Sequence, residues 1–376
     1  MTKLIKYLLS AVFLCTAGYG ATFASAAEKN IIVGQAIDLS GQNGSIGRDY
    51  ATGLATYFDS VNAAGGVNGR RIKYLTRDDR GDAATSAKAV AELIEQDKAD
   101  YLIGGIGGDA VQAVVASASF ARSGQVLFAP LANSSKNYGQ RVLFWRPSQE
   151  QEIQYIFSYF GKLGIKKVGI AYQETPLNQE AYQYVVAELA RRGLSLSGTA
   201  RIFSLPADTD REAKKLAGAT PDIVIAIADT ISTGLFLKEF RKHAARTFVA
   251  GTSLINLTTL AEMAGPKMLE WTVFSQVVPN PSAAASAIQN DHIRMMKKYR
   301  DESVSSLTLE GFVVGKSLVR AMQMSNVANR GGAQNFFAQK SPIDLGGLMI
   351  NPADPGQHLS GYVDIALFRK GGGLLF

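Results

Sequence analysis

Residue patterns typical of enzymes are incomplete in this chain. The three histidines, His243, His292 and His358, are far apart in the sequence, and none has the spacing of a metal ligand. There is neither an H-E-x-x-H zinc pattern nor a G-x-S-x-G nucleophile pattern. These observations give no argument for catalysis, although they do not exclude it. We expect no catalytic residue, no metal ion and no cofactor.

Two glycine-rich patterns match nucleotide-binding motifs only in part. Residues 105–110 match G-x-G-x-x-[GA], but they follow the third expected strand of their block and not the first. No acidic residue occurs at 125–137, where a ribose-binding carboxylate would stand. Gly315-Lys316-Ser317 is similar to the end of a P-loop, but Gly311 is one residue too close. Nucleotide binding is therefore not favoured.

Small and polar residues at the ends of expected strands are better candidates for ligand binding. The loop from Ile106 to Asp109 leads into an expected helix and would present backbone N–H groups and the positive end of the helix dipole, which suit a carboxylate. Asp109 stands where an N-cap belongs, and we favour that role over a ligand contact. In the loop at 130–135, Asn133 and Ser134 could bond a ligand or only form the turn.

The second half of the chain has corresponding loops at 172–177 and 228–230. Asp229 could cap the next helix or bind a ligand cation, and the sequence leaves both roles open. Ser253 is a third and weaker candidate in this half. The full set of ligand-binding candidates is Gly108, Asp109, Leu131, Ala132, Asn133, Ser134, Tyr172, Leu177, Asp229, Thr230 and Ser253.

The elements that position these loops form two blocks of alternating strands and helices. The first block has expected strands at 31–37, 71–79, 101–104 and 126–129, separated by helices at 49–64, 83–96 and 110–121. The second has strands at 167–172, 197–203, 223–228 and 247–250, separated by helices at 178–192, 210–217 and 232–243. This alternation is typical of parallel sheets in an α/β fold. Two such lobes would bind a ligand in the cleft between them.

Residues 1–26 have the features of a secretory signal peptide. Lys3 and Lys6 precede a largely apolar stretch at 7–23, and Ala24-Ser25-Ala26 supplies a cleavage site of small residues. A buried N-terminal helix is the alternative. Cleavage would also remove Cys15, which is the one cysteine of the sequence. We therefore expect an exported, periplasmic protein without thiols or disulfides.

Charge and hydropathy argue against nucleic-acid binding and membrane insertion. Lys and Arg number 39 and Asp and Glu number 32; without the two lysines of the signal segment, 37 basic residues against 32 acidic ones leave a charge of +5. The basic residues are scattered in pairs and do not form runs. Beyond residue 26, no apolar run approaches the roughly 18–20 residues that span a bilayer.

The order of the segments resembles a known family. Ile32-Val33-Gly34-Gln35, then Leu39-Ser40-Gly41 and the N-A-A-G-G-V-N-G stretch at 62–69, are similar to the opening of type I periplasmic solute-binding proteins. These are the leucine/isoleucine/valine-binding protein family of ABC transporters. The resemblance implies two Rossmann-like lobes with parallel central sheets, joined by a hinge of three segments. The N-terminal lobe would comprise 27–147 and 279–348, and the C-terminal lobe 148–278 and 349–376.

The chain departs from the family at the positions that hold an α-amino acid. Gly107-Gly108-Asp109 stands where members usually carry Ser or Thr, and Ala132-Asn133 stands where they have Ala-Thr or Ala-Ser. A covering aromatic looks replaced near Leu177, and an acidic partner of the ammonium group near Ser253. Asp229 is the candidate substitute for that acid. The resemblance thus implies the fold and the transport class without fixing a branched-chain amino acid as ligand.

The function implied by the resemblance is that of a periplasmic receptor of an ABC importer. It would close on a small organic solute, amino-acid-like or an organic acid, and deliver it to a membrane permease. We expect a monomer that binds no nucleic acid and is not inserted in the membrane after cleavage. The alternative is an exported sensory ligand-binding protein or an enzyme on the same two-lobed fold.

Overall fold

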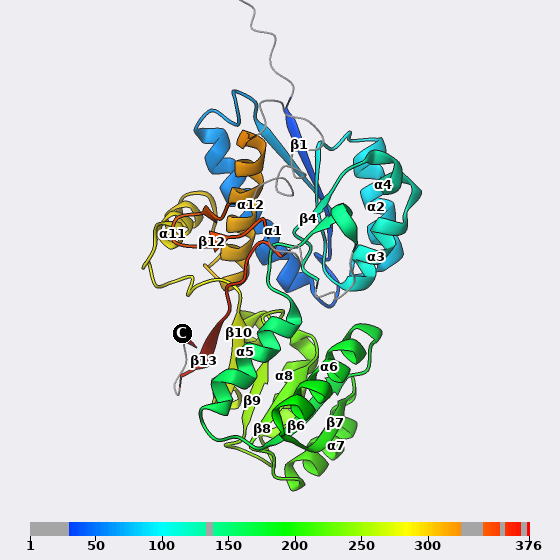
Figure 1. Cartoon of the computed structure of the whole chain (residues 1–376), viewed down its shortest axis with the longest axis vertical. Helices are drawn as coiled ribbons and strands as arrows, with labels where there is room; N and C mark the ends of the chain where they lie inside the picture. Colours follow the sequence, from blue (N-terminus) through cyan, green and yellow to red (C-terminus); the bar gives the residue numbers. More distant parts are fainter. Residues whose placement is uncertain (1–29, 133–137, 325–340, 354–357, 370–373) are drawn as a thin grey trace, which may run out of the picture.

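The computed structural model describes residues 30–132, 138–324, 341–353, 358–369 and 374–376, and it shows two lobes (Figure 1). The first lobe contains a parallel sheet of five strands in the order β2-β1-β3-β4-β5. Its strands are β1 (Ile31–Ile37), β2 (Ile72–Asp78), β3 (Tyr101–Ile103), β4 (Leu127–Phe128) and β5 (Val142–Leu143). Its helices are α1 (Gly44–Ala63), α2 (Ala83–Glu95), α3 (Gly108–Ala116), α4 (Ala118–Ser123), α11 (Ala287–Tyr299) and α12 (Ser306–Met324).

The second lobe contains a sheet of seven strands in the order β14-β13-β10-β9-β8-β6-β7. Its strands are β6 (Lys167–Gln173), β7 (Ser195–Ile202), β8 (Ile223–Ile227), β9 (Phe248–Gly251), β10 (Thr272–Gln276), β13 (Asp364–Phe368) and β14 (Leu374–Leu375). Its helices are α5 (Gln149–Gly161), α6 (Pro176–Arg192), α7 (Pro206–Gly218), α8 (Thr230–Phe240), α9 (Leu257–Ala264) and α10 (Pro266–Leu269). The strands from β7 to β10 pair in parallel, whereas β13 runs antiparallel to β10. The predicted α/β class with parallel central sheets is confirmed.

The chain passes between the lobes three times (Figure 1). It leaves the first lobe between β5 and α5, and it returns between β10 and α11. A short hairpin of β11 (Ile343–Asp344) and β12 (Met349–Ile350) then precedes the last passage to β13. Because α11 and α12 pack on α1, two helices that follow the second sheet in sequence complete the first lobe.

The structure corrects one expected helix and adds two short helices that the sequence did not predict. The helix expected at 110–121 is broken into α3 and α4, because Ser117 is extended (φ −69°, ψ 141°) and its Oγ accepts a hydrogen bond from the Phe120 N–H as a new N-cap. The short helices α9 and α10 were not expected from the sequence. They occupy 257–269, between the buried strands β9 and β10.

The packing of α1 against α12 depends on two glycines. A Cβ atom on Gly53 would lie 2.0 Å from the Thr308 carbonyl oxygen, and one on Gly311 would lie 2.1 Å from the Tyr50 carbonyl oxygen. The helix backbones therefore touch where they cross. Beside this crossing, the rings of Tyr57 and Phe312 meet edge to face with centroids 5.0 Å apart.

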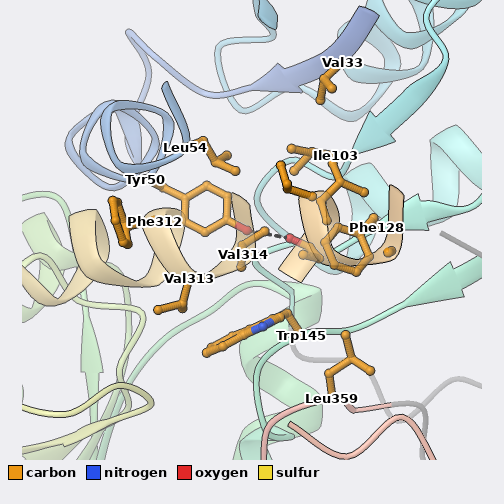
Figure 2. Packing of buried hydrophobic residues seen from close by; sticks show 14 of the residues in the cluster. Val33, Tyr50, Leu54, Ile103, Phe128, Trp145, Phe312, Val313, Val314 and Leu359 are labelled. Carbon is orange, nitrogen blue, oxygen red and sulfur yellow. Dashed lines mark hydrogen bonds between the residues drawn. The ribbon is translucent and has the colours of Figure 1, made fainter. Parts of the chain in front are cut away.

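The core of the first lobe extends from this helix pair to the sheet and to the start of the first crossing segment (Figure 2). Tyr50 is fully buried and donates a hydrogen bond of 2.9 Å to the Ala129 carbonyl oxygen. Burial raises the pKa of the Tyr50 hydroxyl well above its usual value. Trp145 is buried below α12 and donates from Nε1 to Ser317 Oγ at 2.9 Å. These polar contacts fix the strand ends relative to the helices.

Within the described residues, no helix combines the length and the apolar character that a membrane crossing requires.

Gly311→Ala is predicted to destabilise the protein. The added methyl group would meet the Tyr50 carbonyl and push α1 and α12 apart, at a cost of about 1–3 kcal/mol. Urea unfolding measures the loss. Gly218→Ala is the matched control, because Gly218 is an exposed helical residue with nothing within 4 Å of an added Cβ. Equal stabilities of the two variants would contradict the close packing.

Candidate ligand-binding cleft

A cavity of about 180 Å³ lies between the lobes, where the loops after the parallel strands meet. The first lobe contributes Gln42, Asn43, Ile46, Ile106, Gly107, Leu131 and Ala132. The second contributes Gln149, Gln173, Thr175, Asn178, Ile227, Ala228, Asp229, Thr252 and Leu254. The first wall is mostly apolar around the N-termini of α1 and α3, and the second carries most of the hydrogen-bonding side chains. The volume suits a ligand smaller than a typical drug molecule.

The N-terminus of α3 lies at the first wall. Gly107 is the N-cap residue at φ +96°, and among the described residues no side chain caps the helix. The Gly107 N–H itself donates to the Leu131 carbonyl oxygen at 3.0 Å. The first-turn N–H groups and the helix dipole therefore provide a favourable environment for a negative group.

The expectation that Asp109 caps this helix is wrong. Because Gly107 adopts a left-handed conformation that a side chain would disfavour, α3 begins at Gly108, and Asp109 falls in its first turn. Asp109 is exposed and makes no capping hydrogen bond.

Asp229 stands on the second wall. Its Oδ1 accepts a hydrogen bond from the Ser232 N–H at 2.9 Å, so it is the N-cap of α8. Its Oδ2 accepts from Ser232 Oγ at 2.9 Å and from Gln42 Nε2. Since Gln42 belongs to the first lobe, this carboxylate joins the two walls of the cleft. The capping role that the sequence left open is present, together with a position in the cleft.

The remaining predicted residues divide into three groups. Leu131 and Ala132 line the cleft. Gly108, Tyr172, Thr230 and Ser253 are not among the lining residues. Asn133 and Ser134 lie outside the described residues, as does the side chain of Leu177.

Two of the residues outside the lining have clear structural roles. The Tyr172 ring packs on Tyr182 with centroids 4.9 Å apart. Thr230 is buried, and its Oγ1 accepts a hydrogen bond of 3.0 Å from the Asn256 N–H. The contacts of both residues lie within the second lobe.

Sequence reasoning missed several lining residues. Gln42 and Asn43 follow β1, so the rule that selected the other strand ends would have found them. Gln173, Thr175 and Ala228 lie inside loops that the sequence singled out. Gln149 had no local signal, because it begins α5 directly after a crossing segment.

A buried ionic network lies beside the cleft, at the joint between the lobes. Arg146 is 1% exposed; its Nε donates to Glu310 Oε1 at 3.1 Å, and its Nη2 donates to Ser253 Oγ at 2.8 Å. The Ser253 N–H donates to Glu152 Oε2 at 2.8 Å, and Ser275 Oγ donates to the same oxygen at 2.6 Å. Ser253 is flanked by Thr252 and Leu254, which line the cleft. The network therefore anchors a cleft loop.

This network reaches all three crossing segments. Arg146 lies on the first, and Ser275 lies on the strand that leads into the second. His358 lies on the third, with its Nδ1 2.6 Å from the Arg146 carbonyl oxygen. Glu310 belongs to α12 of the first lobe, and its pKa is raised by burial, an effect that the Arg146 guanidinium opposes.

Asn256 makes a second contact between the lobes. Its Nδ2 donates to the Ser45 carbonyl oxygen at 3.2 Å and to Asp49 Oδ2 at 3.3 Å, both on α1. Its Oδ1 accepts from the Thr259 N–H at 3.0 Å and caps α9. One amide thus ties α9 to the first lobe.

The chemistry of the cleft is that of recognition. Asp229 is the one ionisable side chain among the described lining residues. General acid–base catalysis by a pair of groups needs a second one within reach of the substrate. The lining does provide both hydrogen-bond donors and acceptors, as carboxamides and hydroxyls, next to an apolar surface. This combination is typical of small-molecule binding sites.

Comparison with known proteins identifies similar chains. The family described as "Periplasmic binding protein" matches residues 30–336. "Leu/Ile/Val-binding protein homolog 1" of Brucella melitensis is 24% identical over 355 residues, which cover 91% of each chain. "Amino acid binding protein" of Pseudomonas aeruginosa is 33% identical over 75 residues, or 20% of each chain.

Solved structures are similar over nearly the whole fold. The substrate-binding periplasmic protein from Ralstonia solanacearum has a TM-score of 0.84 and 24% identity, covering 92% of this chain and 99% of its own. The branched-chain amino acid transporter substrate binding protein LivJ from Streptococcus pneumoniae, solved in complex with isoleucine, has a TM-score of 0.78 and 18% identity. That match covers 92% of this chain and 97% of the other.

Arg146→Met is predicted to destabilise the protein by roughly 3–5 kcal/mol at pH 7, because it leaves Glu310 buried without its counter-charge. A carboxyl group whose folded pKa lies above its unfolded pKa stabilises less as pH rises between the two values. The loss should therefore be smaller at pH 5 than at pH 7, since Glu310 is then protonated more easily. Urea unfolding at both pH values measures the difference.

Arg122→Met is the control for this prediction, because Arg122 forms an ion pair with Glu95 on the surface, with 71% and 55% of the side chains exposed. Its loss should cost little. A similar cost for both variants, or a loss at Arg146 that does not change with pH, would contradict the role of the buried pair.

Proposed function

The chain belongs to the periplasmic binding protein family, and from this premise we propose that it is the solute-binding component of an ABC importer. It binds a small organic solute between its lobes and delivers the solute to a membrane permease. The names of the relatives, as amino-acid-binding and substrate-binding proteins, support this class. The observation that carries the proposal is a cleft lined by the strand-end loops of both lobes.

The polar groups of the two walls favour an amino-acid-like solute over a simple organic acid. The uncapped N-terminus of α3 suits a carboxylate, and the Asp229 carboxylate suits an ammonium group. The two features stand on different lobes, as a zwitterion held across the cleft requires. The apolar residues Ile46, Leu131 and Leu254 offer contacts for a hydrocarbon side chain.

The proposed capture of the solute depends on contacts that both lobes make with it. A solute that touches both walls gains all its contacts only when the walls are close, so it shifts the hinge equilibrium towards closure. Release returns the solute unaltered, because the proposed role needs no reaction. The protein is proposed to act as an exported periplasmic monomer after cleavage of residues 1–26.

Binding of an amino acid is predicted to stabilise the mature protein and to make it more compact. A solute present at 100 times its Kd adds about 2.7 kcal/mol to the free energy of unfolding. A panel of the common L-amino acids and their decarboxylated and deaminated analogues, followed by Tm measurement, identifies the solute. X-ray scattering with and without that solute then tests closure. An unchanged radius of gyration, or conversion of the solute, would contradict the proposed receptor.

Asp229→Asn is predicted to weaken binding of the solute found in that panel about 10- to 150-fold, because a hydrogen bond to a charged group is replaced by a neutral one. Asparagine also caps helices well, so α8 should stay intact. Isothermal titration calorimetry measures the affinity.

Asp82→Asn is the matched control for Asp229→Asn. Asp82 caps α2 by accepting from the Thr85 N–H at 2.7 Å, and it is not among the cleft residues. Its substitution should leave the affinity unchanged. Wild-type affinity in Asp229→Asn would remove this carboxylate from the proposed site.

A further inference from the structure

A second cavity, larger than the cleft, lies at the joint between the lobes. Its volume is about 430 Å³, within the range of about 300–1,000 Å³ that is usual for small-molecule sites. Four segments enclose it: α9, residues 280–282 of the second crossing segment, residues 304–307 at the start of α12, and the C-terminal residues Phe368, Leu374 and Phe376. Walls from several segments distinguish this cavity from a flat docking surface.

The lining of this cavity indicates what it could hold. Leu257, Ala261, Pro281, Leu307 and Phe368 supply an apolar interior. Glu262 is exposed and is the one ionisable side chain among the described lining residues. An anionic solute would meet no basic side chain among the described lining residues. An uncharged solute would have the smallest free-energy cost of leaving water. Hydroxyl groups of Thr258, Ser282 and Ser306 at the same cavity can orient a polar substituent.

The position of the cavity connects it to the arrangement of the lobes. Asn256 is part of its lining and also donates to Ser45 and Asp49 of the first lobe. The loop from Thr252 to Asn256 thus has the cleft at one end and this cavity at the other. A solute that contacts both α9 and the start of α12 would favour the lobe arrangement that forms these walls.

We propose that this cavity is a second binding site, separate from the cleft, for a small uncharged solute with an apolar body and a hydrogen-bonding substituent. The site is built from both lobes, and its occupant therefore binds one arrangement of the hinge in preference to others. The proposed transport role does not require this site, so a result that contradicts one proposal leaves the other unaffected.

The test uses N-phenyl-1-naphthylamine, an uncharged fluorescent probe, titrated into the full-length mature protein. Wild type should show saturable binding to one site. Ala261→Phe places a phenyl group in the cavity from α9 and should weaken binding about tenfold or more. Ser282→Phe does the same from an exposed position of the crossing segment, where the fold tolerates a larger side chain.

The control is Gln149→Phe, which adds a phenyl group to the cleft lining from a partly exposed position and leaves the second cavity open. Saturable binding of the probe should persist in this variant, and circular dichroism verifies that each variant is folded. Three results would overturn the proposal: binding that does not saturate, binding that survives in both cavity-filling variants, or binding that is abolished in Gln149→Phe.

Discussion

The buried charge of Arg146 constrains the joint between the lobes. A guanidinium group that is 1% exposed must keep its partners, and these come from Glu310 of the first lobe and Ser253 of the second. Pulling the lobes apart at this point would leave charges buried and unpaired. The network therefore holds the cleft loop that contains Ser253 to the first crossing segment.

The two walls of the cleft differ in how their helices are capped. In the second lobe, Thr175, Asp229 and Asn256 each accept a hydrogen bond from their own helix, so these N-termini are already satisfied. In the described part of the first lobe, no side chain caps α1 or α3. The positive ends of helices are thus available on one wall only, and a carboxylate stands on the other. This separation of charge matches a dipolar solute better than a singly charged one.

The contacts of Asn256 with the first lobe also explain why the cleft and the second cavity are neighbours. Asn256 ties α9 to α1, and the start of α12 lines the same cavity as α9. The close crossing of α1 and α12 through Gly53 and Gly311 makes these helices a rigid unit. The loop from Thr252 to Asn256, which ends at the cap of α9, contributes to the lining of both spaces.

The sequence by itself determined the fold class, the two blocks and three residues that line the cleft, Leu131, Ala132 and Asp229. Alternating strands and helices are local patterns, and the carboxyl ends of parallel strands must meet at one edge. Only the tertiary structure showed which residues pair where the lobes meet, and at which residue α3 begins. Arg146 and Glu310 are 164 residues apart, and Gln42 and Asp229 are 187 apart, so no local pattern could pair them. Asp109 does not cap α3, because Gly107 is the N-cap residue at φ +96° and the helix begins at Gly108. The sequence pattern does not indicate this backbone conformation.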